Sequence, residues 1–167
     1  NDVATAGITL GTLEADANVI LTAAGNTAIT NDAALALQGT VTGTLDATAT
    51  TGDITDSDAL AVSGASVFTL GADGTNITLD SAANAFSGAV TLKAGSSGGQ
   101  TFGNIVFVDS GAIDFDSAAS ADGDLFLDGG TDNTVGGTLA VTATTGGITD
   151  SATIAVTGDL TLNDVAT

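Results

Sequence analysis

Acidic side chains are the residues of this sequence whose types and spacing could carry out chemistry. Asp53, Asp56 and Asp58 lie within six positions, and Asp114 and Asp116 would share one face of a strand. Paired carboxylates can act as general acid and general base when their surroundings separate their pKa values. The sequence contains no histidine, and an aspartate in a turn commonly bonds its own backbone. We therefore expect no catalytic residue and no enzyme.

A second candidate site is a set of oxygen-rich turns that could bind calcium. Carboxylate and carbonyl oxygens are the ligands that Ca²⁺ prefers. None of the turns completes an EF-hand loop or the glycine-rich nonapeptide of calcium-binding β-rolls. We expect diffuse screening of the acidic surface by cations, without a cofactor or a dedicated metal site. The alternative is a calcium site, for which the weak candidates are Asp122, Asp124, Asp128 and Asp132.

The composition excludes several classes of partner. Twenty acidic residues stand against one basic residue, Lys93, and the net charge is -19. Because phosphate binding needs lysine and arginine, we expect no nucleic acid partner, and anionic lipid would be repelled as well. The sequence has no cysteine for a disulfide or a thiolate metal site. It also lacks an apolar run of about eighteen residues, so we expect no membrane insertion.

A 22-residue motif occurs twice and organises the chain. Residues 43–64 read GTLDATATTGDITDSDALAVSG and residues 137–158 read GTLAVTATTGGITDSATIAVTG, with 15 of the 22 positions identical. Two of the three clustered aspartates are replaced in the second copy, by Gly147 and Ala152, so the acidic cluster is not part of the repeat. A near-copy at this distance indicates a repeat protein.

The first and last five residues are also identical to each other. Both read NDVAT, at positions 1–5 and 163–167. We therefore expect residues 1–167 to be a single solenoid segment, and one period of a longer tandem array.

Short runs of alternating apolar and polar residues are separated throughout by Gly, Asn, Asp and Ser clusters. Alternation with a period of two, rich in β-branched residues, predicts half-buried strands. With three short strands per coil, the economical all-β arrangement is a parallel β-helix, a β-solenoid of about seven coils of ~23 residues. The aliphatic residues expected to stack in one inward core ladder are Ile8, Ile29, Ile54, Ile77, Ile105, Leu125 and Ile148.

Glycines mark the expected corners of the coil. Gly39, Gly64 and Gly158 each follow an apolar strand run, and Gly88 lies in a comparable place. A corner often requires a positive φ, which glycine adopts without steric cost. We expect these four glycines to lie where the chain turns between strands.

The residues that follow the seven ladder positions predict an outward row. Five of them are threonine, which suits an exposed strand, and the other two are Val106 and Phe126. The glycine- and serine-rich stretch 93–100 precedes both, and we expect it to leave the coil as a loop. That loop or a neighbouring molecule would then cover Val106 and Phe126 in a lateral contact. A threonine-rich face could also bind ice, but ordinary strand propensity is the simpler interpretation of an interrupted row.

The ITDSxxLxVxG cadence of residues 54–64, with ITLD and VTL strands between Gly, Asn and Asp turns, resembles the repeats of large secreted bacterial adhesins. The filamentous-haemagglutinin type is the closest comparison, and the resemblance covers nearly the whole chain. It implies a right-handed β-helical shaft that is exported and holds an adhesive tip away from the cell. The amino-terminal secretion domain of that family is not visible in these residues.

Together these features predict a non-catalytic structural stalk of a giant secreted or cell-surface bacterial adhesin. The alternative is a self-assembling extracellular filament, sheath or surface-layer subunit, and a glycan-binding or ice-binding β-solenoid is the third interpretation. The expected partners are further coils of the same polypeptide or copies stacked end to end. Lateral self-association and host or surface glycans are further candidates.

Overall fold

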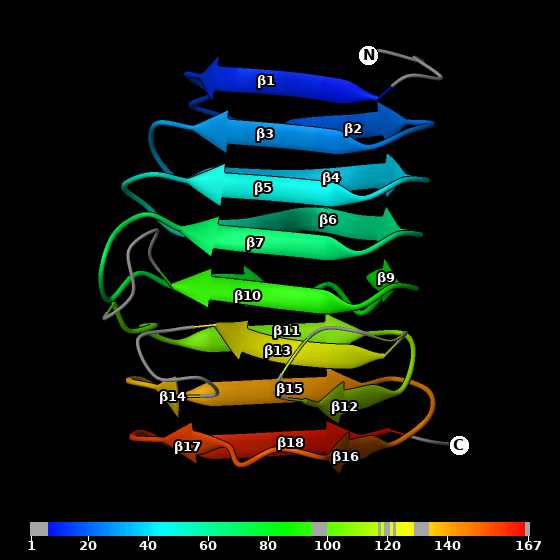
Figure 1. Cartoon of the computed structure of the whole chain (residues 1–167), viewed down its shortest axis with the longest axis vertical. Coiled ribbons are helices and arrows are strands. Elements are labelled where there is room, and N and C mark those ends of the chain that lie inside the picture. Colours follow the sequence, from blue (N-terminus) through cyan, green and yellow to red (C-terminus); the bar gives the residue numbers. More distant parts are fainter. Residues whose placement is uncertain are drawn as a thin grey trace.

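The structure, a computed structural model, describes residues 7–94, 100–116, 118, 121, 123–128 and 134–165. All of the regular structure in these residues is β-strand. They contain no helix that is long and apolar enough to cross a membrane. The strands are stacked in a column, with β1 at one end and β18 near the other (Figure 1).

Two eight-stranded sheets and one small sheet make up the column. Sheet A contains, in spatial order, β1 (Ile8–Leu13), β3 (Thr27–Asn31), β5 (Leu45–Ala49), β7 (Ser66–Leu70), β10 (Val90–Ala94), β13 (Asp124–Asp128), β12 (Ile113–Phe115) and β16 (Ile148–Asp150). Sheet B contains β2 (Val19–Ala23), β4 (Leu35–Val41), β6 (Ile54–Val62), β8 (Ile77–Leu79), β11 (Ile105–Asp109), β15 (Leu139–Ala143) and β18 (Leu160–Asp164), with β9 (Ala85–Phe86) also paired to β6. The small sheet pairs β14 (Thr134–Val135) with β17 (Ala155–Val156).

Every strand pairing among the described residues is parallel. In Figure 1 the strands of sheet A run leftward in front and those of sheet B run rightward behind, while the chain descends, so the coil is right-handed. The expected parallel β-solenoid of about seven turns is confirmed, with a repeat of ~21 residues. Of the three short strands expected per coil, most described turns form only two, one in each large sheet, and the short additional strands are β9 in sheet B and β14 and β17 in the small sheet.

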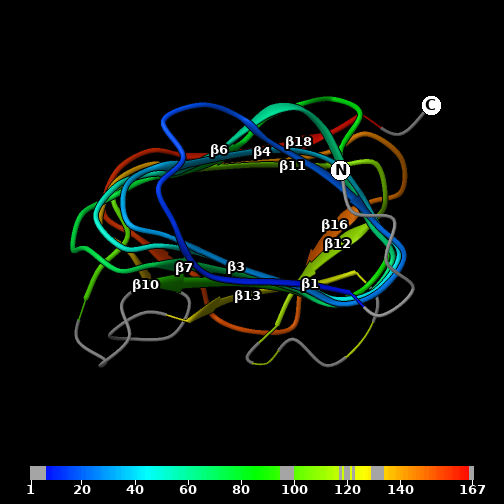
Figure 2. The same ribbon diagram turned by 90° about the horizontal axis from the view of Figure 1, so that it is seen from above.

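The core lies between sheets A and B, inside the oval ring that Figure 2 shows from above. Strands β3, β7, β10 and β15 alternate buried and half-buried residues along their length. This alternation is what a strand shows when one of its faces is covered. Each aliphatic side chain that is buried stabilises the fold by about 1.5–3 kcal/mol, and one apolar cluster runs through the whole column.

Three of the seven predicted ladder residues do stack. Ile54, Ile77 and Ile105 pair in register in sheet B, and each has no exposed surface. The column continues at both ends of this trio. Its members are, in order, Leu35, Ile54, Ile77, Ile105, Leu139 and Leu160.

The other four predicted ladder residues lie in sheet A, so the prediction of one seven-residue ladder is wrong. These residues are Ile8, Ile29, Leu125 and Ile148. The physical reason is that the spacing between ladder positions is not always one full turn. The 25 positions from Ile29 to Ile54, for example, cross from one sheet to the other. All seven side chains still belong to, or pack against, the same core.

The two copies of the 22-residue motif also lie on opposite sheets. Their ITD residues are in β6 of sheet B in the first copy and in β16 of sheet A in the second. The serine of the ITDS sequence nevertheless makes the same hydrogen bond in both copies. Ser57 Oγ donates to the Leu37 carbonyl oxygen at 3.5 Å, and Ser151 Oγ donates to the Phe115 carbonyl oxygen at 3.3 Å. The two copies differ beyond this contact, because the first continues as one strand to Val62 whereas the second divides into β16 in sheet A and β17 in the small sheet.

Strands β12 and β13 interrupt the regular order of turns. β13 follows β12 in the sequence but lies between β10 and β12 in sheet A. The detour lengthens the turn that contains it. Asn104 and Thr138 occupy successive turns 34 residues apart, whereas Asp53 and Asn76 at the same corner are 23 residues apart.

Gly64, Gly88 and Gly158 lie between strands as expected, but Gly39 lies inside β4, where the register with β6 shifts, so the corner predicted at Gly39 is wrong. Gly39 has a positive φ of 114°. A Cβ at Gly64, Gly88 or Gly158 would instead lie between 2.6 and 2.7 Å from backbone atoms of the preceding turn. At these three positions glycine permits the close approach of two turns.

Candidate functional site

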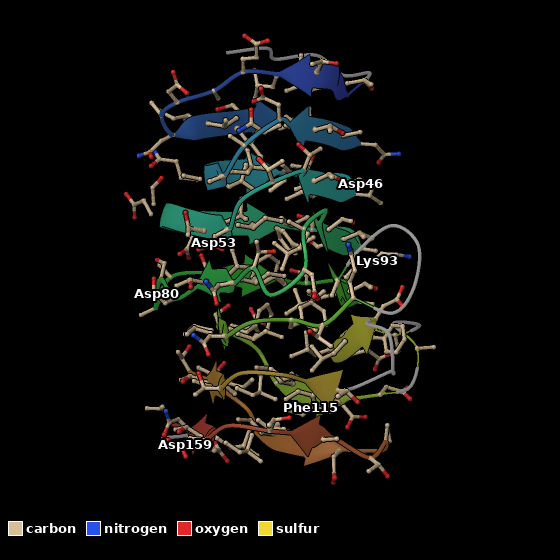
Figure 3. The ribbon with its side chains drawn as sticks, turned by 90° about the vertical axis from the view of Figure 1, so that its left-hand side faces the viewer. Asp46, Asp53, Asp80, Lys93, Phe115 and Asp159 are labelled. Atoms are coloured by element: carbon tan, nitrogen blue, oxygen red, sulfur yellow. The ribbon has the colours of Figure 1, made fainter. Side chains whose placement is uncertain are left out.

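Polar side chains at one corner of the coil form a ladder of hydrogen bonds between turns. Asp53, labelled in Figure 3, accepts the backbone N–H of Asn76 through Oδ1 at 2.8 Å and the Asn76 side-chain amide through Oδ2 at 3.1 Å. Asn76 Oδ1 accepts the N–H of Asn104 at 2.7 Å, and Asn104 Oδ1 accepts the N–H of Thr138 at 2.9 Å. Each side chain thus satisfies a backbone donor of the following turn.

Asp56 connects two turns in the same way within the 22-residue motif. Its carboxylate accepts the backbone N–H groups of Asp80 and Ser81, at 3.0 and 2.9 Å. It also accepts the side-chain amide of Asn84 at 2.6 Å. Asn84 is fully buried and accepts the N–H of Leu60 through its own Oδ1 at 2.9 Å. Asp56 therefore orders a buried polar network of the next turn.

Asp56→Ala is expected to lower the free energy of unfolding by about 1.5–3 kcal/mol, because it leaves several donors unpaired, one of them buried. Asp58→Ala is the matched control, since it removes the same charge from an exposed residue whose carboxylate accepts the N–H of the adjacent Ala59. We expect this control to change stability by no more than about 0.5 kcal/mol. Chemical denaturation measures both values, and equal losses would contradict the role assigned to Asp56.

The second pair of carboxylates considered for acid–base chemistry, Asp114 and Asp116, also takes part in structural interactions. The Asp114 carboxylate accepts the hydroxyl groups of Thr149 at 2.9 Å and Ser151 at 3.3 Å, both from the next turn. Asp116 is engaged as well: its backbone N–H donates to the Leu125 carbonyl oxygen at 3.3 Å. Structural hydrogen bonds therefore engage the carboxylates of four of the five aspartates considered for chemistry, Asp53, Asp56, Asp58 and Asp114.

Two of the four calcium candidates, Asp122 and Asp132, lie outside the described residues. Asp124 is buried, and its Oδ2 accepts the N–H of Ala121 at 2.6 Å. Asp128 forms an ion pair with Lys93. In the part of the chain that the structure describes, no three His, Cys, Asp or Glu side chains gather into a group that could hold a metal ion.

Lys93 is a strand residue and not the first residue of a loop. It belongs to β10, where it pairs in register with Thr69 and Asp128. Its Nζ lies 2.8 Å from Asp128 Oδ2. Both side chains are partly exposed, so the ion pair contributes at most about 1 kcal/mol. The prediction that residues 93–100 form a loop is therefore wrong for Lys93 and Ala94, which belong to β10. Residues 95–99 lie outside the described part of the chain.

The predicted outward row is divided between the sheets. Thr55, Thr78 and Val106 follow one another in sheet B. Phe126 lies in sheet A, where it pairs with Thr91. Val106 and Phe126 therefore belong to different sheets, and the cover of both by one loop or one neighbouring molecule stays a prediction. A lateral contact at either residue alone stays a prediction.

Two aspartates have pKa values displaced in opposite directions. Burial raises the pKa of the Asp109 carboxyl above its ordinary value of 3.8, although the N–H of Phe86, 2.9 Å from Oδ1, acts the other way. The backbone N–H and the hydroxyl of Thr101, at 2.8 and 3.1 Å, lower the pKa of Asp73.

We expect Asp109 to titrate above pH 3.8 and Asp73 below it. A raised folded-state pKa means that the folded protein binds this proton more tightly, so the contribution of Asp109 to stability grows as the pH falls through its folded pKa. The stabilisation by Asp73 is complete above the unfolded pKa and is lost as the pH falls through the folded pKa. Carboxyl ¹³C NMR titration measures both midpoints, and two midpoints at 3.8 would contradict the environments described.

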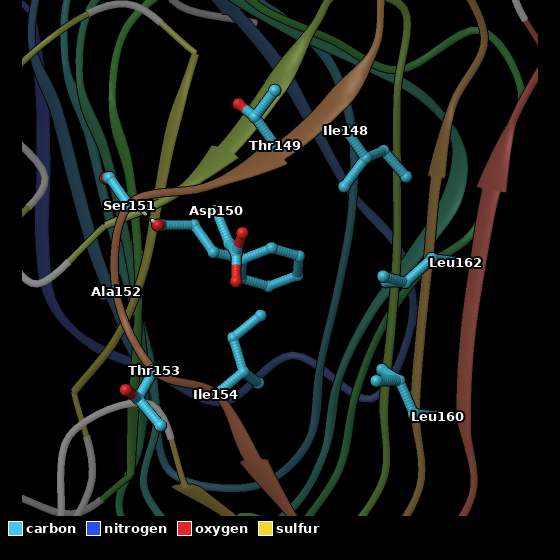
Figure 4. A pocket seen from close by; sticks show the side chains of 10 residues that line it. Ile148, Thr149, Asp150, Ser151, Ala152, Thr153, Ile154, Leu160 and Leu162 are labelled. Carbon is cyan, nitrogen blue, oxygen red and sulfur yellow. Dashed lines mark hydrogen bonds between the residues drawn. The ribbon is translucent and has the colours of Figure 1, made fainter.

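A recess lies at the C-terminal end of the part of the column that the structure describes. A recess of about 660 Å³ lies between β16, β18 and the segment that joins them (Figure 4). Leu160 and Leu162 pair with buried residues of β15 but are themselves 50% and 45% exposed. The residues that line the recess are Phe115, Ile148, Thr149, Asp150, Ser151, Ala152, Thr153, Ile154, Leu160 and Leu162. At the opposite end of the column, Leu10 and Ile20 are 40% and 65% exposed.

Asp150 is the residue of this recess that the sequence analysis missed. It is exposed, and its carboxylate has no hydrogen-bond partner among the described residues. A signal was available in the sequence. Asp150 occupies the position of Asp56 in the second ITDS motif, and it is the one member of the aspartate cluster that both copies contain.

A family model described as repeats of unknown function (DUF5649) matches residues 24–93 and 102–167. Each matched range contains one copy of the 22-residue motif. No curated protein and no solved structure matches the chain.

Proposed function

We propose that this chain, which belongs to the family of repeats of unknown function (DUF5649), is a non-catalytic shaft segment of a giant bacterial adhesin. The adhesin would be secreted or displayed at the cell surface, as the resemblance to filamentous-haemagglutinin repeats implies. In this role the segment works mechanically, as a spacer between the cell and an adhesive tip.

The observation that carries the proposal is that strands pair within sheet A and within sheet B from one end of the described column to the other. Each sheet contains eight strands, and each interior turn is hydrogen-bonded to the turn before it and the turn after it. In a one-dimensional repeat protein each turn contacts only its neighbours, so length can grow by the addition of turns. Seven turns at ~4.8 Å each give a rod of about 34 Å. An architecture that lengthens by the addition of identical turns suits a molecular spacer.

The acidic side chains support the same role. Asp53 and Asp56 connect adjacent turns, and Asp114 bonds hydroxyl groups of the next turn. A net charge of -19 also makes parallel shafts repel one another, which opposes lateral clumping. Structural use of the carboxylates favours a shaft over a catalytic β-helix.

Immunogold electron microscopy of the source cells, with antibodies raised against this segment, tests the proposal. We expect gold particles outside the cell, along fibres that project from its surface. Labelling confined to the cytoplasm would contradict the proposed location and the adhesin with it. Preimmune serum on the same cells supplies the control.

A self-assembling extracellular filament or surface-layer subunit is the second candidate function. The two candidates differ in the size of the mature polypeptide. An adhesin shaft predicts one very large polypeptide on an immunoblot of secreted protein, whereas a filament subunit predicts a small one.

A further inference from the structure

We propose that the shaft contains a joint at the pairing of β12 with β13, where sheet A opens while sheet B stays closed and acts as the hinge. The joint separates an N-terminal stack, which ends with β11 and β13, from a C-terminal stack, which begins with β12 and β15. The inference rests on the shaft proposed above, and it specifies where that shaft bends and toward which side.

Strand β13 is an insertion in an otherwise regular turn. β12 and β14 pair with β16 and β17 of the next turn, so these two turns are built alike. Residues 151–154 separate β16 from β17, whereas the longer stretch 116–133, which contains β13, separates β12 from β14. In Figure 1 β13 lies below β10 and above both β12 and β14. Sheet B has no matching strand among the described residues, because β11 pairs directly with β15.

The inserted strand is held firmly by its neighbour in the N-terminal stack. Residues 125–128 of β13 pair in register with residues 90–93 of β10. On the inner face Leu127 has no exposed surface. On the outer face the ion pair between Lys93 and Asp128 joins the same two strands. β13 therefore belongs to the stack that contains β10.

The pairing of β13 with β12 is shorter. It joins Asp124 to Asp114 and Leu125 to Phe115, whereas every other pair of neighbouring strands in sheet A joins between three and five residues of each strand. Asp114 and Asp124 are acidic residues in register, and like charges directly opposite each other destabilise a strand pair. This pairing is therefore the weakest in the described part of sheet A.

Sheet B is continuous at the same level of the column. All five residues of β11 pair in register with β15. The corner that leads into these strands is continuous as well, because Gly137 N–H donates to the Gly103 carbonyl oxygen at 3.0 Å. Beside the start of β13, by contrast, a cavity of about 290 Å³ lies between Phe86 of the N-terminal stack and Ala112, which precedes β12. The two stacks thus meet closely along sheet B and less closely beside β13.

This asymmetry determines how the column yields. Opening of the joint breaks the hydrogen bonds of the Asp114 and Asp116 N–H groups to β13 and its preceding residue, and it leaves the pairing of β11 with β15 intact. Local opening of this kind follows the part of a structure with the fewest backbone hydrogen bonds. The C-terminal stack then tilts toward the side of sheet B. A shaft with such a joint bends under a sideways load without the unfolding of a turn.

Hydrogen exchange of the intact chain, measured by NMR, tests the joint. Asp114 N–H donates to the Gly123 carbonyl oxygen at 2.8 Å across the joint. Ile105 N–H donates to the Thr138 carbonyl oxygen, also at 2.8 Å, across the same level in sheet B. After correction for intrinsic rates, we expect Asp114 to exchange about ten-fold faster than Ile105, or more. Equal rates would show that the two sheets open together, which overturns the proposal.

The adjacent residue of β12 distinguishes a joint from opening that begins at the C-terminal side. Ile113 N–H donates to the Gly147 carbonyl oxygen at 3.0 Å, so it faces the next turn, whereas Asp114 N–H faces β13. We expect Ile113 to exchange more slowly than Asp114, because β12 and β16 move as one body when the joint opens. Faster exchange at Ile113 would mean that turns separate in order from one end, and it would overturn the joint.

Asp114→Asn tests the contribution of the like charges. Asparagine keeps an oxygen that accepts the Thr149 hydroxyl group, 2.9 Å away in the native chain, but removes the charge opposite Asp124. We expect exchange of the Asp116 N–H, which donates to the Leu125 carbonyl oxygen across the joint, to slow about two- to five-fold.

The matched control is Asp46→Asn, which removes an equal charge from a residue whose register neighbours are Ala28 and Val67. We expect it to leave exchange at Asp116 unchanged. An equal effect of the two variants would contradict the role of the charges opposite each other at the joint. Failure of the joint would leave the surface labelling expected of a shaft unaffected, so the two proposals fail separately.

Discussion

Ile77→Ala is expected to lower the free energy of unfolding by about 2–5 kcal/mol. Ile77 is fully buried and stands between Ile54 and Ile105 in the continuous column of sheet B. The backbones above and below are held ~4.8 Å away by hydrogen bonds, so they cannot move in to fill the cavity. The loss should therefore lie toward the upper part of that range. Chemical denaturation of the purified chain measures it.

Thr78→Ala is the control for this prediction, because Thr78 is the next residue of the same strand and points to the other face. It is half-buried and pairs with Thr55 and Val106. We expect a loss of no more than about 1 kcal/mol, which reflects strand propensity. A larger loss at Thr78 than at Ile77 would mean that the strand faces the core with the opposite set of side chains.

Gly39→Ala is expected to cost about 3 kcal/mol or more. Gly39 has a φ of 114°, where residues with a Cβ are strained by roughly 1–3 kcal/mol. A Cβ there would also lie 2.1 Å from the carbonyl oxygen of Leu21 in the preceding turn. Since that neighbour is backbone in β2, relief of the overlap would disturb the pairing of β2 with β4. Thermal and chemical unfolding measure the loss.

Two other glycines separate the contributions of strain and contact. Gly74 has a φ of 69°, but a Cβ at this residue would meet open space, so Gly74→Ala should show the cost of the dihedral alone, about 1–2 kcal/mol. Gly11 has neither a positive φ nor a close neighbour, and Gly11→Ala should be neutral within about 0.5 kcal/mol. An equal loss at all three positions would contradict the close stacking of turns at Gly39.

The fold class was accessible from the sequence because its causes are local. Alternation with a period of two and glycines at corners act over a few residues, and the 22-residue duplication shows that the same local structure recurs. The strand register, meaning which residues of successive turns pair and in which sheet, could not be predicted in the same way. Strands of both sheets alternate buried and half-buried residues, as β3 does in sheet A and β15 in sheet B, so alternation alone does not assign a residue to one sheet. Only the lengths of the intervening corners decide which sheet a residue joins.

The roles of the aspartates show a similar limit. The sequence predicts an aspartate that bonds its own turn, and Asp58, bonded to Ala59, is of this kind. Asp53 and Asp56 instead bond residues 23 to 28 positions away. Contacts between turns depend on the register of the coil, which local patterns leave open.

The most direct test of the stacked solenoid is a set of distances along the outward column of sheet B. Its members are Ala36, Thr55, Thr78, Val106, Ala140 and Thr161. Spin labels at Ala36 and Thr161 should lie about 24 Å apart, and labels at Ala36 and Ala140 about 19 Å, because each turn adds ~4.8 Å. Electron paramagnetic resonance on such pairs should give distances that rise by one equal step per turn. Distances that do not increase in this order would contradict the solenoid, and with it the shaft.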